Sequence, residues 1–188
     1  MLKESAEKLE VHKGHIIHVF ETHLLDGRVL EVAARPPGTR VIIHNTETNE
    51  ILLSCENRID IGEDYRLPGG KVRDSWDEWT QIKDSSDLDK VIIEAAAKEA
   101  REEVGFDVSD LQVFNVQTSG GPTIKWDMYY LVATKFSDRG HQELELGEDI
   151  KFAWYPVEEV IDACLTGKIR EGRSVAALLQ YLHSIGQI

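Results

Sequence analysis

An alanine-rich segment that ends in three clustered glutamates constrains the fold of this chain more than any other feature. Residues 86–104 are rich in alanine, the residue that most favours a helix, and form the longest helical candidate in the sequence. Ser86 or Asp87 can cap the start of this segment, and Gly105 can end it. We therefore predict a helix over residues 86–104.

Three carboxylates share one face of this predicted helix. Glu99 lies beside Glu102 and Glu103, at spacings of three and four residues. Like charges so placed repel by about a few tenths of a kcal/mol per pair, and the negative end of the helix dipole adds to that cost. A divalent cation would relieve both penalties, and Mg²⁺ favours carboxylate oxygens together with substrate phosphates. The alternative is a solvated acidic face paired with Lys98 and Arg101, which the bare spacing favours.

β-Prone segments flank the helix on both sides. Their apolar runs are bounded by turns, as in buried strands. We predict strands at residues 40–44, 51–55, 111–118, 124–136 and in FAWYPV, a loop over residues 56–64, and C-terminal helices in EEVIDACLTG and SVAALLQYLHSI. Strands on both sides of a central helix indicate a layered α/β arrangement.

The N-terminal part predicts a separate β-hairpin arm. Residues 15–34 form two strand candidates around the Asp26-Gly27 turn, and Pro36-Pro37-Gly38 marks the junction with the body. On a strand a spacing of three residues alternates faces, which disfavours a shared metal site. We therefore predict that four histidines of this region face solvent: His12, His15, His18 and His23.

The Leu67-Pro68-Gly69-Gly70 turn and the Lys98–Phe106 stretch together resemble the Nudix box, whose consensus is GX5EX7REUXEEXGU with U an apolar residue. Gly70 matches the leading glycine, and the terminal block matches at Glu99, Ala100, Glu102, Glu103, Gly105 and Phe106. The resemblance implies a Nudix-type α/β/α sandwich with a mixed central sheet and an N-terminal β-hairpin arm. It assigns residues 1–38 to the arm and 39–188 to the Nudix hydrolase domain, with an insertion at about 73–88.

The chain departs from the box at three points. Lys98 replaces the arginine, which keeps the charge but loses the bidentate fork. Nineteen residues instead of five separate Gly70 from the early-glutamate position, and that position is Lys90. In the family this residue is an outer contributor and not the main ligand, so we expect the core of the site to remain. Glu78, on the insertion, is a candidate substitute.

Features outside the box are similar to the ADP-ribose pyrophosphatase branch of the family. RLPGGKV after Glu56-Asn57-Arg58 is similar to the branch's residues around an LPAGK-like turn, and GKIREGRSVAALLQYL matches its C-terminal helix. Pro122 lies sixteen residues after Phe106, where the branch has a proline, although Gly120 takes the proline slot of its Ser-Pro-Gly pattern. The resemblance implies Mg²⁺-dependent hydrolysis, with Mn²⁺ as the alternative ion. The implied substrate is ADP-ribose or another nucleoside-diphosphate sugar, and the products are a nucleoside monophosphate and a sugar phosphate.

The same resemblance assigns roles to individual residues. Glu99, Glu102, Glu103 and the carbonyl of Gly69 would hold the metal. On the loop before the last strand, Glu148 best matches the family's base or water-orienting glutamate, with Glu145 and Asp149 as alternatives. The candidates for binding phosphate or ribose are Arg35, Arg58, Arg66, Ser119 and Gly120. Each arginine has an equally weighted alternative as a surface ion pair.

Composition limits the partners. A formal net charge of −13 disfavours nucleic acid, whose backbone is bound by clustered Lys and Arg. No apolar run approaches the ~18 residues of a membrane span, and the first ten residues lack the apolar region of a signal peptide. We therefore expect a cytoplasmic protein that binds a small nucleotide-sugar substrate and neither a membrane nor nucleic acid. The N-terminal hairpin resembles the arm that these enzymes use to dimerise, and it is too short to bury its own apolar face, so we expect a homodimer.

Two other functional classes stay open. One is a Nudix hydrolase of nucleoside triphosphates or dinucleoside polyphosphates, since the base and the sugar are not readable from the sequence. The other is a catalytically weakened nucleotide-binding regulatory module, suggested by Lys90 and the interrupted box.

Overall fold

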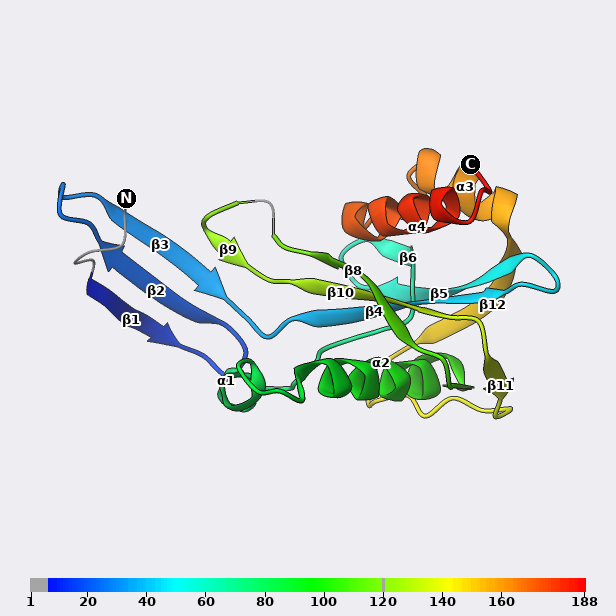
Figure 1. Cartoon of the computed structure of the whole chain (residues 1–188), viewed down its shortest axis with the longest axis horizontal. Helices are drawn as coiled ribbons and strands as arrows, with labels where there is room; N and C mark the ends of the chain where they lie inside the picture. Colours follow the sequence, from blue (N-terminus) through cyan, green and yellow to red (C-terminus); the bar gives the residue numbers. More distant parts are fainter. Residues whose placement is uncertain (1–6, 120) are drawn as a thin grey trace.

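A mixed six-stranded β-sheet forms the centre of the molecule, with helices on both faces (Figure 1). The computed structural model describes residues 7–119 and 121–188. The sheet runs in the order β12 (Ile150–Pro156), β5 (Glu50–Arg58), β4 (Gly38–Asn45), β10 (Met128–Ala133) and β8 (Gln112–Gln117), with β6 (Gly62–Arg66) paired to β5. Strands β4 and β10 are parallel, and the other pairs are antiparallel. The predicted α/β/α sandwich with a mixed central sheet is confirmed.

Alternation along β4 divides the core into two layers. Ile42 points to the side covered by α3 (Val157–Leu165) and α4 (Gly172–Ser184), where it packs with Leu178. Its neighbours Val41 and Ile43 point to the opposite side, which α2 (Leu88–Val104) covers. Successive strand residues face opposite sides of a sheet, so a near-continuous apolar run can serve two layers at once. Each fully buried side chain of this kind contributes about 1.5–3 kcal/mol.

Helix α2 confirms the long predicted helix, although it starts two residues later. Asp87 occupies the N-cap position without a side-chain hydrogen bond. Gly105 ends the helix in a left-handed conformation, with φ at 71°, and its N–H donates to the carbonyls of Ala100 and Arg101. This cap fixes where the helix stops and therefore how far its last turn, which carries the glutamates, projects.

Two segments differ from the predicted elements. The predicted loop over residues 56–64 is wrong, because β5 continues to Arg58 and a tight turn leads into β6. The predicted single strand over residues 124–136 is wrong as well, because it divides into three. Its first piece, β9 (Ile124–Lys125), pairs with the arm, while its last, β11 (Phe136–Asp138), pairs with β7 (Phe106–Val108). These partners lie far apart in sequence, so local β-propensity does not reveal them.

The N-terminal arm is a second sheet in the order β1 (Glu7–Lys13), β2 (His18–His23), β3 (Val29–Ala34) and β9. We call these four strands the arm sheet. The predicted hairpin turn forms between β2 and β3, with Gly27 at a φ of 84°, whereas β1 was not predicted. Figure 1 shows the arm sheet extending away from the central sheet. Among the described residues, no helix combines the length and the apolar character that crossing a bilayer requires.

The insertion forms a short helix, α1 (Trp76–Ile82), between the arm sheet and α2 (Figure 1). Ser75 caps this helix by accepting a hydrogen bond from the Glu78 N–H. The prediction that His18 faces solvent is wrong, since His18 is only 1% exposed. Its ring stacks on Trp76, with the ring centroids 5.2 Å apart. The insertion supplies this cover, which the sequence of the arm alone does not indicate.

Candidate active site

One cavity of about 500 Å³ lies beside the last turns of α2, and the Gly69-Gly70 turn, α1 and the loop before β12 form its other walls. We call it the carboxylate cavity, because most of its charged lining residues are acidic: Asp74, Glu78, Glu94, Glu99, Glu102, Glu103, Glu145 and Glu148. The basic lining residues are Lys71, Arg73 and Lys98. The cavity therefore collects all four glutamates that the sequence singled out as catalytic.

The two glycines of the turn allow backbone and carboxylates to meet. Gly69 has a φ of 144°, and a Cβ at this position would overlap the Thr39 carbonyl oxygen. The Gly69 N–H donates to Glu103 Oε2 at 2.7 Å. A Cβ on Gly70 would overlap the carboxylate of Glu99. Gly69 is thus required by its conformation and by the backbone beside it, whereas a side chain at Gly70 would displace the Glu99 carboxylate.

Burial sets the protonation of the two deepest glutamates. It raises the pKa of Glu99 to about 7, partly opposed by Lys98. It raises the pKa of Glu103 to about 7 as well, although Arg40 and the Gly69 N–H favour the charged form. Glu102 is held differently, because Lys98 Nζ lies 2.7 Å from its Oε2. Two carboxyls kept from ionising fully by burial and by each other are a suitable donor set for a divalent cation, which would stabilise their charged forms.

The glutamates line an open cavity instead of a closed cage. Within residues 7–119 and 121–188, no three His, Cys, Asp or Glu side chains already converge as ligands of one ion. Mg²⁺ commonly binds through one or two carboxylates and completes its shell with water and substrate phosphates. An open set of Glu99, Glu102 and Glu103 beside the Gly69 backbone fits that mode better than it fits a structural metal cage.

The loop before β12 brings a fourth glutamate to the cavity. Glu148 is half-buried there, and its Oε2 accepts a hydrogen bond from the Glu145 N–H at 2.8 Å. Its charge contributes to the raised pKa of both Glu99 and Glu103, so it lies within electrostatic range of both. Glu145 lines the same cavity, whereas Asp149 lines a separate pocket with Cys55 and Lys151. Of the three candidates that the sequence left open on this loop, the geometry therefore sets apart Asp149, while Glu145 and Glu148 both line the cavity.

Lys90 lies outside the cavity. Its side chain is 75% exposed, and its Nζ lies 3.8 Å from Glu94. Glu78 on α1 does line the cavity. Sequence reasoning missed Glu94, although its spacing of four from Lys98 and eight from Glu102 places it on the same helix face. It also missed Lys71 and Arg73, whose position directly after the glycine turn was the available signal.

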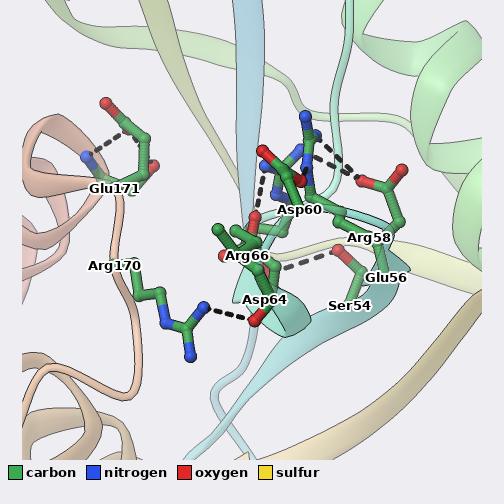
Figure 2. A network of polar contacts seen from close by, with 10 residues as sticks. Ser54, Glu56, Arg58, Asp60, Asp64, Arg66, Arg170 and Glu171 are labelled. Atoms are coloured by element: carbon green, nitrogen blue, oxygen red, sulfur yellow. Dashed lines mark hydrogen bonds and ion pairs between the residues drawn. The ribbon is translucent and has the colours of Figure 1, made fainter.

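Two of the predicted substrate arginines take part in an ion-pair network on β5 and β6, shown in Figure 2. Arg66 contacts Glu56 at 3.2 Å and also pairs with Asp64. Arg58 lies 3.4 Å from the same Glu56 and 3.6 Å from Asp60. Neither arginine lines the carboxylate cavity. Their described contacts are those of structural ion pairs, with only the Arg66 Nε left without a partner.

A cluster of four arginines lies at the junction of the arm with the body, and we call it the arginine cluster: Arg35, Arg40, Arg66 and Arg173. Arg35 and Arg173 both stack on Trp126, at 4.4 and 4.3 Å from its ring. Burial lowers the pKa of Arg35, and the charges of Arg173 and Arg40 lower it further. Burial also lowers the pKa of Arg40, which Glu103 opposes. The cluster therefore concentrates positive charge next to the acidic cavity.

Buried polar atoms without a partner gather at this cluster. Among the described residues, the buried side-chain atoms that lack a hydrogen-bond partner are Arg35 Nε, Arg40 Nε, Arg66 Nε, Thr39 Oγ1 and Trp126 Nε1. Such atoms are rare in folded proteins, and each costs about 1–3 kcal/mol when left unpaired. Four of the five are N–H donors, so an anion is the ligand that would satisfy them.

Ser119, which was predicted to bind phosphate or ribose, makes hydrogen bonds within its own loop. Its hydroxyl donates to the Ile124 carbonyl and accepts from the Trp126 N–H at 3.4 Å. These bonds close the loop before β9 and set the position of Trp126. Gly120, the other predicted residue of this loop, lies outside the described residues.

Comparison with known proteins gives one family and one fold. A model of the NUDIX domain matches residues 34–178, and no curated protein matches the chain. A crystal structure of an ADP compounds hydrolase is similar with a TM-score of 0.68 and 18% identity, over 98% of this chain and 96% of that chain. A structure of MutT, from work on Aliivibrio salmonicida and Vibrio cholerae, has a TM-score of 0.48 and 18% identity, over 77% and 97% of the two chains. The first likeness shows a shared fold, and the second is too low to support an argument.

Proposed function

Because the chain belongs to the NUDIX domain family, we propose that it hydrolyses the pyrophosphate bond of ADP-ribose or another nucleoside-diphosphate sugar with the help of Mg²⁺. The observation that carries the proposal is the adjacency of two oppositely charged regions. The carboxylate cavity offers ligands for a cation, and the arginine cluster next to it offers unpaired N–H donors to an anion. A metal-bound diphosphate with a further polar group would bring a cation to the carboxylate cavity and an anion to the arginine cluster.

In this proposal Glu99, Glu102, Glu103 and the carbonyl of Gly69 hold Mg²⁺, with Mn²⁺ as the alternative ion. The ion would neutralise the diphosphate and lower the pKa of an attacking water. Lys98 orients Glu102 through their contact at 2.7 Å. The Gly69 N–H fixes one oxygen of Glu103 and leaves the other free.

Glu148 accepts the proton of the attacking water or orients that water. Its hydrogen bond from the Glu145 N–H fixes one carboxylate oxygen, while the side chain faces the cavity that holds the other glutamates. Lys71 and Arg73 lie on the cavity wall, where phosphate oxygens would meet them. Cleavage of the phosphorus–oxygen bond between the two phosphates then gives a nucleoside monophosphate and a sugar phosphate.

Substrate selection is assigned to the arginine side of the site. Of the residues predicted from the sequence, Arg35 and Arg66 each carry an unpaired Nε atom, and Arg58, Ser119 and Gly120 are further candidates for phosphate or ribose. The preference for a nucleotide sugar is supported by the ADP-ribose pyrophosphatase-like tail and the Ser119–Pro122 segment. The similar fold of a protein named ADP compounds hydrolase fits the same preference.

A substrate panel tests this function. ADP-ribose, GDP-mannose, UDP-glucose and the nucleoside triphosphates are assayed with Mg²⁺, with Mn²⁺ and with EDTA. We expect one of the sugar compounds to have the highest kcat/KM, a monophosphate and a sugar phosphate as products, and no turnover in EDTA. A triphosphate preferred with release of pyrophosphate would place the protein among triphosphate hydrolases. No turnover of any compound would leave a regulatory binding module.

We further propose that the arm forms a homodimer. Arm residues 1–38 continue into a hydrolase domain over 39–188, and the face of the arm sheet turned away from α1 carries Leu9 and Val29, both exposed. Sedimentation of the full chain is compared with the Leu9→Lys and Val29→Lys variants and with a chain starting at Pro37. A full-length monomer at micromolar concentration would refute the dimer.

A cytoplasmic location is proposed as well, and recovery in the membrane or secreted fraction of cells would refute it.

A further inference from the structure

A second pocket, of about 270 Å³, lies between the arm sheet and the insertion helix α1. We call it the arm pocket. Its apolar walls include Phe20, Val32 and Trp76, and three lysines surround it: Lys8, Lys83 and Lys125. None of its lining residues is acidic within the part of the chain that the structure describes. The protein has a formal net charge of −13, so a pocket whose charged lining residues are all basic is unusual and indicates an anionic ligand.

Strand register assembles one wall of the arm pocket. Phe20 pairs with Val32, and Lys8 pairs with Thr22 two positions away on the same face of the sheet. On the opposite edge, β9 pairs with β3 so that Lys125 lies beside Ala34. Partners across neighbouring strands point to one side. The two outer strands of the arm sheet therefore each supply one lysine, and the strands between them supply the apolar floor.

The insertion supplies the other wall. Trp76 and Lys83 are seven positions apart, two turns of a helix, and so project from one side of α1. Glu78 is two positions from Trp76 and projects toward the carboxylate cavity, which it lines. Trp76 is fixed on the arm by the stacking of its ring on His18, by a ring contact with Phe20 at 5.9 Å between centroids and by its backbone N–H, which donates to the His15 carbonyl at 3.1 Å. Helix α1 thus separates the two pockets and contributes to both.

The lysines of this pocket are largely free of carboxylate partners. Lys8 and Lys125 form no ion pair with any described residue, and Lys83 has only a 3.9 Å contact with its neighbour Asp84. Lys8 lies 4.0 Å above the Phe20 ring, which draws its charge toward the pocket floor. Three flexible ammonium groups around an apolar floor match a ligand that combines an anionic group with a flat apolar ring.

We propose that the arm pocket is a second, non-catalytic binding site for a small phosphate monoester that carries an aromatic ring, the chemistry of a nucleoside monophosphate. The ring lies on the wall formed by Phe20, Val32 and Trp76, and the phosphate is held by Lys8, Lys83 and Lys125. The volume of about 270 Å³ lies just below the ~300–1,000 Å³ usual for ligand sites, which suits one ring and one phosphate and excludes a dinucleotide. The choice of a monophosphate rests on the proposed function, of which it is a product, whereas the recognition chemistry does not.

Binding is measured by isothermal titration calorimetry on the full-length protein in EDTA, with AMP as the probe. EDTA removes divalent ions and so weakens AMP binding at the acidic cavity, while AMP held at the arginine cluster is recognised by its insensitivity to the arm-pocket lysine variants. Adenosine and inorganic phosphate, which each carry half of the chemistry, are titrated in parallel. We expect one AMP per arm pocket, with adenosine and phosphate each bound there at least tenfold more weakly. No measurable AMP binding, or phosphate bound as tightly as AMP, would overturn the proposal.

A matched set of variants locates the site. The double variant Lys8→Gln with Lys125→Gln removes two exposed lysines of the pocket, and Lys135→Gln removes an exposed lysine at the opposite end of the molecule, near β11 (Figure 1). We expect AMP affinity to fall at least tenfold in the double variant and to stay within twofold in the control. Basal kcat and KM should be unchanged in both, because none of these lysines lines the carboxylate cavity. Equal affinity in both variants would place AMP elsewhere.

The two proposals fail separately. If AMP binds and the double variant loses it while no nucleotide sugar is hydrolysed, the arm pocket stands and the proposed function falls. If nucleotide sugars are hydrolysed while AMP binding is absent or insensitive to the lysines, the proposed function stands and the arm pocket falls. The Trp76→Phe variant keeps a ring on the wall and should keep AMP affinity within threefold. If Trp76→Phe lost as much AMP affinity as the double variant, AMP binding would depend on the folding of α1 and not on the proposed contacts. That result would count against the arm pocket.

Discussion

The carboxylate cavity and the arginine cluster lie side by side and handle charge in opposite ways. In the cavity, burial raises the pKa of Glu99 and Glu103 to about 7, so these acids are partly neutral near physiological pH. In the cluster, burial lowers the pKa of Arg35 and Arg40 from an ordinary arginine value that is far above 7, and both guanidinium groups stay charged. Each of them also carries an unpaired Nε atom. The two regions meet where Arg40 approaches Glu103.

The difference indicates what each region needs from a ligand. The acids reduce the cost of burial by binding protons, and a cation would replace those protons. The arginines have no such route, and only an incoming anion would satisfy their donors. One ligand that brings both charges, a diphosphate with a bound metal, would therefore be favoured over either charge alone. The predictions below separate the two regions, from the largest expected effect to the smallest.

The change expected to have the largest effect is Glu103→Gln, which keeps the side-chain size and removes the charge at the deepest point of the cavity. We expect kcat to fall by about 10²–10³-fold, the scale of removing a preorganised charged group from a catalytic site. Asp89→Asn, in the first turn of the same helix and outside the cavity, is the matched control. Turnover of Glu103→Gln within a few-fold of the Asp89→Asn value, with the fold intact by circular dichroism, would rule out this metal site.

The second prediction concerns stability without metal. Glu99 and Glu103 have a folded-state pKa of about 7 against an ordinary 4.5, so between these values the folded state binds more protons than the unfolded state. Their contribution is therefore fully present at low pH and is lost as the pH rises through about 7. From pH 5.5 to 8 we expect a loss of about 2–4 kcal/mol attributable to the pair.

Thermal unfolding in EDTA measures this loss, and two comparisons isolate it. Added Mg²⁺ should reduce the pH dependence by binding the charged form of the pair. The double variant Glu99→Gln with Glu103→Gln should lose that part of the pH dependence altogether. If the double variant keeps the full pH dependence of the wild type, the buried acids are not its source.

The sequence predicted the acidic region better than the basic one, and the reason is physical. Glu99, Glu102 and Glu103 lie on one helix, where a spacing of three or four residues already fixes which side chains meet. The alanine content and the glycine cap predicted the helix, and the apolar runs bounded by turns indicated the central strands. Local rules of this kind operate within one element, whereas Glu148 was assigned only through the family resemblance.

The arginine cluster joins four separate elements, so no local spacing reveals it. Arg35 follows β3, Arg40 lies on β4, Arg66 ends β6 and Arg173 begins α4. The sequence singled out Arg35 and Arg66 for phosphate, but not Arg40, Arg173 or the Trp126 ring between them. The same reason explains the missed β1 and β9 and the burial of His18, which depend on pairing and stacking between distant segments.

The third prediction tests the basic region by itself. Arg35→Gln should raise KM for the nucleotide sugar by about tenfold, the scale of one charged hydrogen bond, and should leave kcat within about threefold. Arg28→Gln at the arm turn, where Arg28 pairs with Asp26, removes the same charge as a control. Arg35→Lys should recover part of the affinity, because it keeps the charge but loses the planar stacking on Trp126. An equal KM in Arg35→Gln and Arg28→Gln would remove Arg35 from the substrate site.

The smallest effect is expected from Lys90→Glu, which restores the glutamate that the family has at this box position. If position 90 belonged to the acidic region, a new carboxylate would strengthen the metal site and raise kcat. The Lys90 side chain is 75% exposed and outside the cavity, and its contact with Glu94 at 3.8 Å is a surface ion pair of little energy. Kinetics of Lys90→Glu should therefore stay within about twofold of the wild type, on the scale of the lost ion pair.

Glu78→Gln removes a carboxylate that the insertion does bring into the cavity, and it should lower kcat more than Lys90→Glu changes it. A gain of fivefold or more in Lys90→Glu would mean that α2 turns position 90 toward the metal during catalysis, and the boundary of the acidic region would then move from Glu94 about one turn toward the start of that helix.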